Sequence, residues 1–148
     1  MIMDVIIDEK NTSLLDTEYF QPEMKILNKL KNLIETDFKV NRNVNKYTDE
    51  LGVTLYYLNS LTKYYFGCTV YELLQARVHQ EALYLLQNSK LSIKQITFEI
   101  GTCDPSYFCR CFRKIEGVSP SDYRKRRELL IKNSSVNKFS ERNERYRY

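Results

Sequence analysis

Residues 92–117, SIKQITFEIGTCDPSYFCRCFRKIEG, hold the beginnings and ends of two predicted helices. Ser92 and Gln95 form a capping box, in which each side chain can accept the backbone N–H of the other residue. Asp104-Pro105 is an N-cap followed by proline at the first helical position, where a missing N–H costs nothing. Gly101 and Gly117 end the two helices, because glycine adopts a left-handed cap without steric cost. The stretch therefore predicts a short helix, a tight turn and a second helix.

The same pattern occurs earlier in the chain. Val44–Gly67, VNKYTDELGVTLYYLNSLTKYYFG, aligns with Ile93–Gly117 when one residue is added in the second turn. The small Thr48 and Thr97 let the two helices of each copy approach closely. A plain helical hairpin is the alternative, but two copies of matched length favour a repeated helix-turn-helix unit. The matched pairs are Tyr47 with Ile96, Thr48 with Thr97, Leu51 with Ile100, Gly52 with Gly101, Tyr57 with Tyr107, Leu58 with Phe108 and Gly67 with Gly117.

Capping signals and apolar spacing predict about seven helices and no convincing strand. The fourth runs over 20 residues and is about 30 Å long, close to the roughly 34 Å between successive major-groove faces of DNA. We expect an all-α fold with two helix-turn-helix units joined by this long linker helix. The predicted helices begin at Pro22, Val44, Thr54, Thr69, Ser92, Asp104 and Ser119, and the last runs through Leu130. The predicted domains are an irregular N-terminal arm or linker remnant (1–21), the double unit (22–132) and a basic, disordered tail (133–148).

Charge is distributed unevenly along the chain. The first 21 residues carry one Lys and five acidic side chains, whereas residues 110–148 carry 12 basic and five acidic ones. A basic C-terminal third fits a polyanionic partner, although a solvated basic tail is the simpler alternative. Nothing in the sequence is apolar over the roughly 20 residues that span a bilayer, and Met1–Asp8 is acidic without a basic flank. We expect a cytoplasmic protein with no membrane partner.

The titratable residues give no support for an enzyme. Cys68, Cys103, Cys109 and Cys111 lack the usual spacing of zinc ligands, and the single histidine, His79, is remote from them. No pair of titratable groups stands at a spacing suited to acid–base or nucleophilic catalysis. We therefore expect free thiols, no metal, no cofactor and no catalytic residues.

Residues Gly101–Arg124 are similar to the signature of the AraC/XylS transcription regulators. Ser92-Ile-Lys-Gln-Ile fits the helix before that signature, and Tyr47–Thr54 fits the first unit. The resemblance covers roughly 44–127 and implies a two-unit DNA-binding domain, usually attached to a separate N-terminal sensor or dimerisation domain. Three residues depart from the family pattern: the family commonly has Phe at the position of Thr102, Arg at that of Ser60 and Phe at that of Thr62. The contacts of the first unit are therefore less well defined than its fold.

The resemblance implies which side chains meet DNA. Arg110 can form two hydrogen bonds with guanine, and Asn59 two with adenine. Tyr107, Phe108 and Phe112 are expected in the core. For every polar candidate the alternative is simple solvation of an exposed helix face. The base-contacting candidates are Tyr56, Asn59 and Ser60 in the first unit and Ser106, Cys109 and Arg110 in the second; Lys63, Arg113 and Lys114 are the phosphate candidates.

Together these features predict a sequence-specific regulator, of the bacterial AraC type, that binds double-stranded DNA through both units in adjacent major grooves and contacts RNA polymerase. The alternative is an AraC-like protein-interaction module that modulates another regulator and binds DNA only weakly. The nearly uncharged first unit motivates it, since Lys63 is the single charged residue in 54–66.

Overall fold

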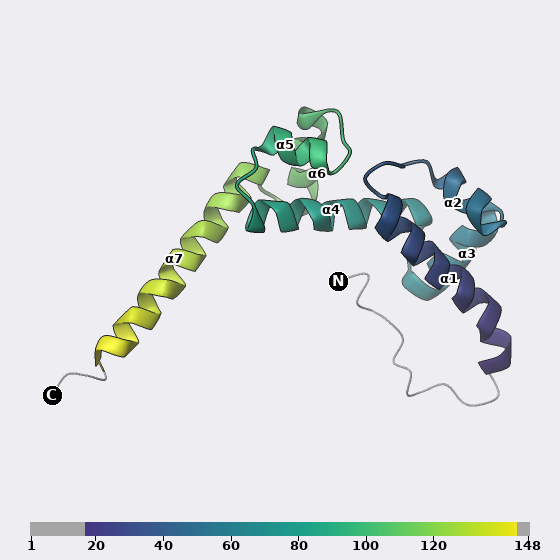
Figure 1. The fold of residues 1–148 in the computed structure, drawn as a ribbon, viewed down its shortest axis with the longest axis horizontal. Coiled ribbons are helices and arrows are strands. Elements are labelled where there is room, and N and C mark those ends of the chain that lie inside the picture. The colour runs from purple at the N-terminus through teal and green to yellow at the C-terminus, as the bar shows by residue number, and fades with distance from the viewer. Residues whose placement is uncertain (1–16, 145–148) are drawn as a thin grey trace. The chain divides into compact units, whose positions relative to one another are not determined.

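The fold is seen in a computed structural model, which describes the backbone of residues 17–144 and the side chains of residues 22–134. Within this range the regular elements are seven helices and no strand, as the sequence predicted (Figure 1). No described helix is both long and apolar enough to cross a membrane. The helices are α1 (Thr17–Asp37), α2 (Val44–Leu51), α3 (Leu55–Phe66), α4 (Val70–Asn88), α5 (Ile93–Glu99), α6 (Pro105–Glu116) and α7 (Pro120–Glu144).

The first and last helices are longer than the sequence predicted. Helix α1 begins at Thr17, so Pro22 lies inside it instead of opening it. A proline inside a helix lacks the backbone N–H and its ring crowds the carbonyl four residues earlier, which is why the sequence predicted the helix to start at Pro22. Helix α7 continues to Glu144 instead of ending near Leu130, and residues 133–144 contain no Gly or Pro that would stop it. Most of the predicted N-terminal arm, residues 1–16, lies outside the described residues.

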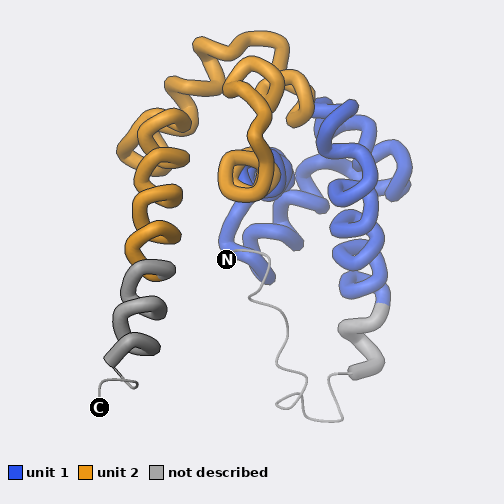
Figure 2. The backbone as a smooth tube through the Cα atoms, turned by 60° about the vertical axis from the view of Figure 1, so that its left-hand side comes forward, with its two compact units in different colours: residues 1–80 blue, residues 81–148 orange. Residues whose placement is uncertain are grey.

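The chain forms two compact units, residues 1–80 and 81–148, coloured separately in Figure 2. In the first unit the apolar residues of α1 recur every three or four positions and are buried on one side of the helix, because this spacing follows the helical period. They pack in a core with residues of α2, α3 and the first half of α4. The buried apolar residues of this unit are Leu27, Leu30, Ile34, Phe38, Tyr47, Leu58, Leu61, Val70, Leu73, Leu74 and Val78.

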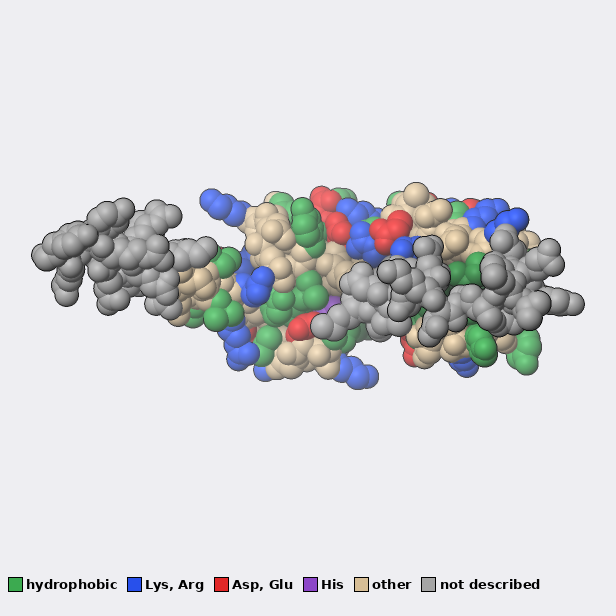
Figure 3. All heavy atoms as spheres, turned by 90° about the horizontal axis from the view of Figure 1, so that it is seen from below, with side chains coloured by type: hydrophobic (Ala, Val, Ile, Leu, Met, Phe, Trp, Pro, Cys, Tyr) green, Lys and Arg blue, Asp and Glu red, His purple; other side chains and the backbone are tan. Residues whose placement is uncertain are grey.

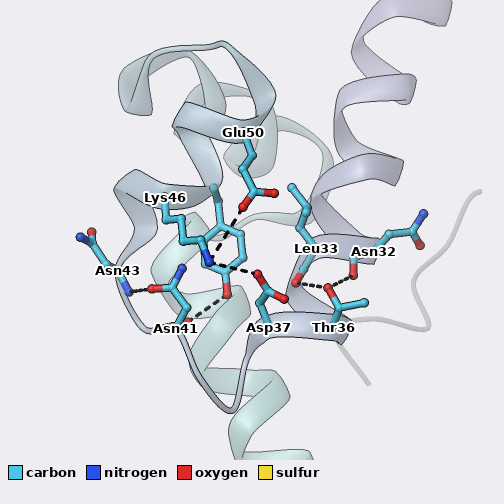
Figure 4. Close-up of polar contacts among 9 residues, drawn as sticks. Asn32, Leu33, Thr36, Asp37, Asn41, Asn43, Lys46 and Glu50 are labelled. Atoms are coloured by element: carbon cyan, nitrogen blue, oxygen red, sulfur yellow. Dashed lines mark hydrogen bonds and ion pairs between the residues drawn. The ribbon is translucent and has the colours of Figure 1, made fainter.

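Polar contacts at the end of α1 hold α2 in place (Figure 4). Lys46 Nζ lies 3.6 Å from Asp37 Oδ2 and 4.0 Å from Glu50 Oε1. The Tyr47 hydroxyl donates a hydrogen bond to the carbonyl of Asn41 (3.0 Å), in the connection between the two helices. These contacts fix the connection between α1 and α2, at which the first helix-turn-helix unit starts.

Helix α4 is joined to α1 by a charged side chain. Arg77 Nε donates to both carboxylate oxygens of Glu35 at 2.9 Å, and its guanidinium lies 4.2 Å from the centroid of the Phe38 ring. A paired guanidinium over an aromatic face gains from both contacts. The first half of α4 is therefore held against α1 within the first unit.

In the second unit the core is built around α5 and α6. Ile96, Ile100, Phe108 and Phe112 are buried, and Phe112 meets the ring of Tyr123 edge-on at 5.6 Å between centroids. Helix α7 is joined to the end of α4 by three hydrogen bonds: Gln87 Nε2 to the Tyr123 hydroxyl (2.7 Å), Arg124 Nε to the Leu86 carbonyl (3.2 Å) and Arg127 to Gln87 Oε1 (3.3 Å).

The predicted repeat is confirmed helix by helix. Helices α3 and α6 each contain 12 residues, and each follows a short helix of eight or seven residues. Gly52 and Gly101 have φ of 67° and 74°, the left-handed backbone that the tight turns need. Thr48 and Thr97 are buried where the two helices of each unit meet. A single uninterrupted α4 follows the first copy and leads to the second.

Candidate nucleic-acid interface

The second helix of each unit begins at a side-chain cap. Thr54 Oγ1 accepts the backbone N–H of Tyr57 (3.2 Å) at the start of α3. Asp104 Oδ1 accepts the N–H groups of Ser106 (2.8 Å) and Tyr107 (3.2 Å) at the start of α6, with Pro105 as the first helical residue. Both caps are the ones that the sequence predicted, and they fix where each helix starts.

On α3 the exposed candidates lie along one side, at spacings of three and four residues. Tyr56 is 83% exposed, Ser60 is exposed with its hydroxyl donating to the Tyr56 carbonyl (2.9 Å), and Lys63 is exposed. Tyr64, which the sequence analysis did not select, is 78% exposed and continues this line from Ser60. Thr62 is fully buried, so the position where the family often has Phe belongs to the core here as well.

Asn59 differs from the other candidates of the first unit. Its side chain is half-buried, and its Oδ1 accepts the backbone N–H of Val70, the first residue of α4, at 3.0 Å. A two-bond contact with adenine would need that same oxygen. The structure therefore does not bring Asn59 into the exposed line of Tyr56, Ser60 and Lys63.

On α6 four candidates share an exposed side. Ser106 and Arg110 are one turn apart, and Arg113 and Lys114 follow within the last turn, all with exposed side chains. Two cations in the last turn also favour the helix, because its C-terminal end carries partial negative charge. This line of four side chains, the α6 strip, carries three positive charges, whereas the matching positions of α3 (Tyr56, Ser60, Lys63 and Tyr64) carry one.

The remaining residues of α6 divide between core and surface. Phe108 and Phe112 are buried, as expected, but Tyr107 is 52% exposed, so its predicted place in the core was wrong. Tyr107 lies in the first turn of α6, and its match Tyr57 is also exposed. Cys109 is half-buried, and burial raises the pKa of its thiol.

The thiols and acidic side chains of the described residues are the candidate metal ligands. All four cysteines are free. Among the described side chains there is no group of three or more His, Cys, Asp or Glu that could hold a metal ion. Figure 3 shows Lys and Arg side chains beside hydrophobic ones on the face that it draws. Exposed cations can bind phosphates, and exposed apolar groups can contact base edges.

Comparison with known proteins gives the family. A family model described as a helix-turn-helix domain matches residues 47–126, more than half of the chain and nearly the whole repeat. The chain belongs to the AraC/XylS family of transcription regulators. Within the matched region the family and the fold are those of DNA-binding transcription regulators and not of enzymes, as the sequence predicted.

Individual relatives share this AraC-type region. The chain is 31% identical over 100 residues to the Msm operon regulatory protein of Streptococcus mutans, covering 67% of this chain and 36% of that protein. It is 34% identical over 80 residues to Histidine kinase P4 of Formosa agariphila, which is 54% of this chain and only 6% of the kinase. An AraC-type regulator of Chromobacterium violaceum has the same fold, with a TM-score of 0.65 at 22% identity over 72% of this chain and 96% of that one. The chain spans less than half the length of the curated relatives that it matches.

Proposed function

We propose that this chain binds double-stranded DNA in a sequence-specific way and thereby regulates transcription, with α3 and α6 entering adjacent major grooves. The α6 strip carries the proposal, because Ser106, Arg110, Arg113 and Lys114 are exposed together on the second helix of a helix-turn-helix unit. In such units this helix lies in the major groove and presents its exposed side chains to base edges and phosphates.

The proposed roles follow from side-chain chemistry. Arg110 contacts guanine O6 and N7, and Ser106 and Cys109 contact neighbouring bases. Arg113 and Lys114 near the end of α6 contact phosphates, as Lys63 does on α3. Tyr56 and Ser60 make the base contacts of the first unit, where a tyrosine ring and a hydroxyl suit a thymine methyl group and a polar base edge. Asn59, proposed from the sequence as a third base contact there, would have to release Val70 first.

Selection of bound sequences from random duplex DNA, followed by a salt titration on the selected site, tests this proposal. We expect a single preferred motif and an affinity that falls as salt rises, because each phosphate neutralised contributes about 0.9 to the slope of log affinity against log salt. The single strands of the same site serve as the control. A slope near zero, or equal affinity for single strands, would contradict duplex-specific binding.

We also propose that the bound protein contacts RNA polymerase and that a sensor or dimerisation domain lies outside these residues. The AraC-type resemblance supports both proposals, and the greater length of the curated relatives supports the second. Transcription in vitro from a template carrying the selected site, with purified RNA polymerase, tests the first of them. Transcript levels that do not change on adding the protein would contradict it.

A protein-interaction module is the second candidate, favoured by the surface of α3. Tyr56 and Tyr64 are among the most exposed aromatic residues within 22–134, and Lys63 is the one cation in the line that they share. Tyrosine is enriched in protein interfaces, where its ring supplies contact area and its hydroxyl a hydrogen bond. If selection yields no preferred sequence and the salt slope is near zero, this candidate replaces the first.

A further inference from the structure

Helix α4 begins with a capping box that provides no acceptor for the buried N–H of Val70. The Thr69 N–H donates to Glu72 Oε2 (2.7 Å), and the Glu72 N–H donates to Thr69 Oγ1 (3.2 Å). The first four N–H groups of a helix have no partner within it, so each needs one from elsewhere. The box serves the residue before the helix and the third residue in it. It does not serve Val70, the first helical residue.

The backbone N–H of Val70 cannot donate a hydrogen bond to water. The residue is 0% exposed, and a buried N–H without a partner is strongly unfavourable. Its partner is Asn59 Oδ1, at 3.0 Å, from a residue eleven positions earlier in the middle of α3. One side chain thus ties the centre of the DNA-facing helix of the first unit to the start of α4.

The second unit meets the same requirement by different means. In the repeat, Cys109 takes the place of Asn59 and Pro120 that of Val70. Helix α7 also begins with a side-chain cap, in which Ser119 Oγ accepts the Asp122 N–H (3.1 Å) and its hydroxyl donates to Asp122 Oδ2 (2.7 Å). Its first residue, Pro120, is buried but has no N–H. No acceptor is needed at the matching position of α6, and a cysteine stands there.

We propose that Asn59 is a positioning residue, which fixes α3 on the start of α4 by accepting the Val70 N–H, and that it is not a base contact. The proposal rests on the proposed function only in taking α3 as a DNA-facing helix. Two-bond recognition of adenine needs the amide oxygen and the amide nitrogen together. In Asn59 the oxygen is occupied within the protein.

A double-mutant cycle in the full chain tests the bond itself. Asn59→Ala leaves the Val70 N–H buried without a partner, and we expect the unfolding equilibrium constant to rise roughly 5- to 150-fold. Val70→Pro removes the donor, as in the second unit, so Asn59→Ala made in the Val70→Pro background is expected to cost much less. Val70→Ala measures the packing lost at that site, and Cys109→Ala is the matched control in the second unit. An equal effect of Asn59→Ala in both backgrounds would overturn the proposal.

Duplex binding, measured well below the melting temperature, distinguishes positioning from base contact. Asn59→Ala is expected to weaken binding, and the double variant Asn59→Ala/Val70→Pro to regain affinity although it lacks the amide. Asn59→Asp keeps the acceptor and is expected to keep both stability and base preference, with a uniform loss of affinity from its added negative charge. Loss of preference at one A·T pair in Asn59→Asp, without rescue in the double variant, would make Asn59 a base contact. If the unaltered chain binds no duplex, the proposed function fails while the unfolding cycle still decides the bond.

Discussion

Arg110 lies one turn after Ser106 on the exposed side of α6, away from the buried Phe108 and Phe112. Its guanidinium can meet a guanine edge with two parallel hydrogen bonds, which a phosphate contact does not require. We expect Arg110→Ala to cost about 1–3 kcal/mol on the selected site and to relax preference at one base pair. Arg113→Ala is the matched control, expected to weaken all sequences alike. Equal losses on selected and random duplexes would make Arg110 a phosphate contact.

Tyr65 is a titrating group within the first unit. Burial, followed by its hydrogen bond to Glu23 (2.8 Å), raises the pKa of Tyr65 from 10.0 to about 12. The folded state therefore favours the protonated phenol, so this contribution to stability is present below pH 10 and is lost as pH rises from 10 to 12. We expect Tyr65→Phe to flatten the alkaline loss of stability in denaturant titrations over that range. Glu23→Gln, which removes the negative charge beside this phenol, is expected to flatten the same loss to a smaller extent; an unchanged alkaline loss in both variants would contradict the assignment.

For single residues, the sequence predicted which side chains are exposed. It did not predict their hydrogen-bond partners equally well. The exposed positions of Arg110, Arg113 and Lys63 follow from the helical period around buried Leu58 and Phe108. The hydrogen bond from Val70 to Asn59 could not be predicted in this way, because it joins the middle of α3 to the start of α4 and depends on how the two helices pack. The repeat contains a signal for this bond, because Cys109 and Pro120 stand in the second copy where Asn59 and Val70 stand in the first.

Helix α5 has only seven residues, so its ends matter more than its length. The Gln95 N–H donates to Ser92 Oγ (3.1 Å) and the Ser92 N–H to Gln95 Oε1 (2.8 Å), which completes the predicted capping box. We expect Ser92→Ala to lower the free energy of unfolding by about 1 kcal/mol, because an N-cap hydroxyl is lost. Ser121→Ala, in the exposed first turn of α7, is the control in chemical denaturation. No difference between the two variants would mean that the cap is dispensable.

Among the elements, those between Val44 and Glu116 were predicted to within a residue or two, whereas α1 and α7 were not. The inner helices are bounded by side-chain caps and by glycines in the left-handed conformation, which are local signals. The start of α1 and the end of α7 lack such signals. Pro22 looked like a helix start but lies within α1, and no breaker separates Leu130 from Glu144.

Across the whole molecule, the two copies of the repeat have the same helical structure but different charge. The line Tyr56, Ser60, Lys63 and Tyr64 on α3 corresponds to the α6 strip of Ser106, Arg110, Arg113 and Lys114, and the two lines carry one and three positive charges. The caps, the turn glycines and the buried threonines match between the copies. The shared framework therefore supports a strongly cationic helix in one unit and a tyrosine-rich helix in the other.

This difference predicts that the two units contribute unequally to DNA binding. Replacing the two proposed phosphate contacts Arg113 and Lys114 together by Gln removes two cations from α6, and we expect the slope of log affinity against log salt to fall by up to about 1.8. Lys63→Gln removes the one cation of the α3 line, with a fall of up to about 0.9. Ser60→Arg, which places a cation where the AraC-type family often has one, is expected to tighten binding and steepen the slope by a similar amount. Salt titrations of the four proteins on one duplex measure these changes. Equal falls for the Arg113/Lys114 variant and for Lys63→Gln would mean that charge on the two helices does not set their shares of the binding, whereas a ratio near two would place most of the electrostatic attraction in the second unit.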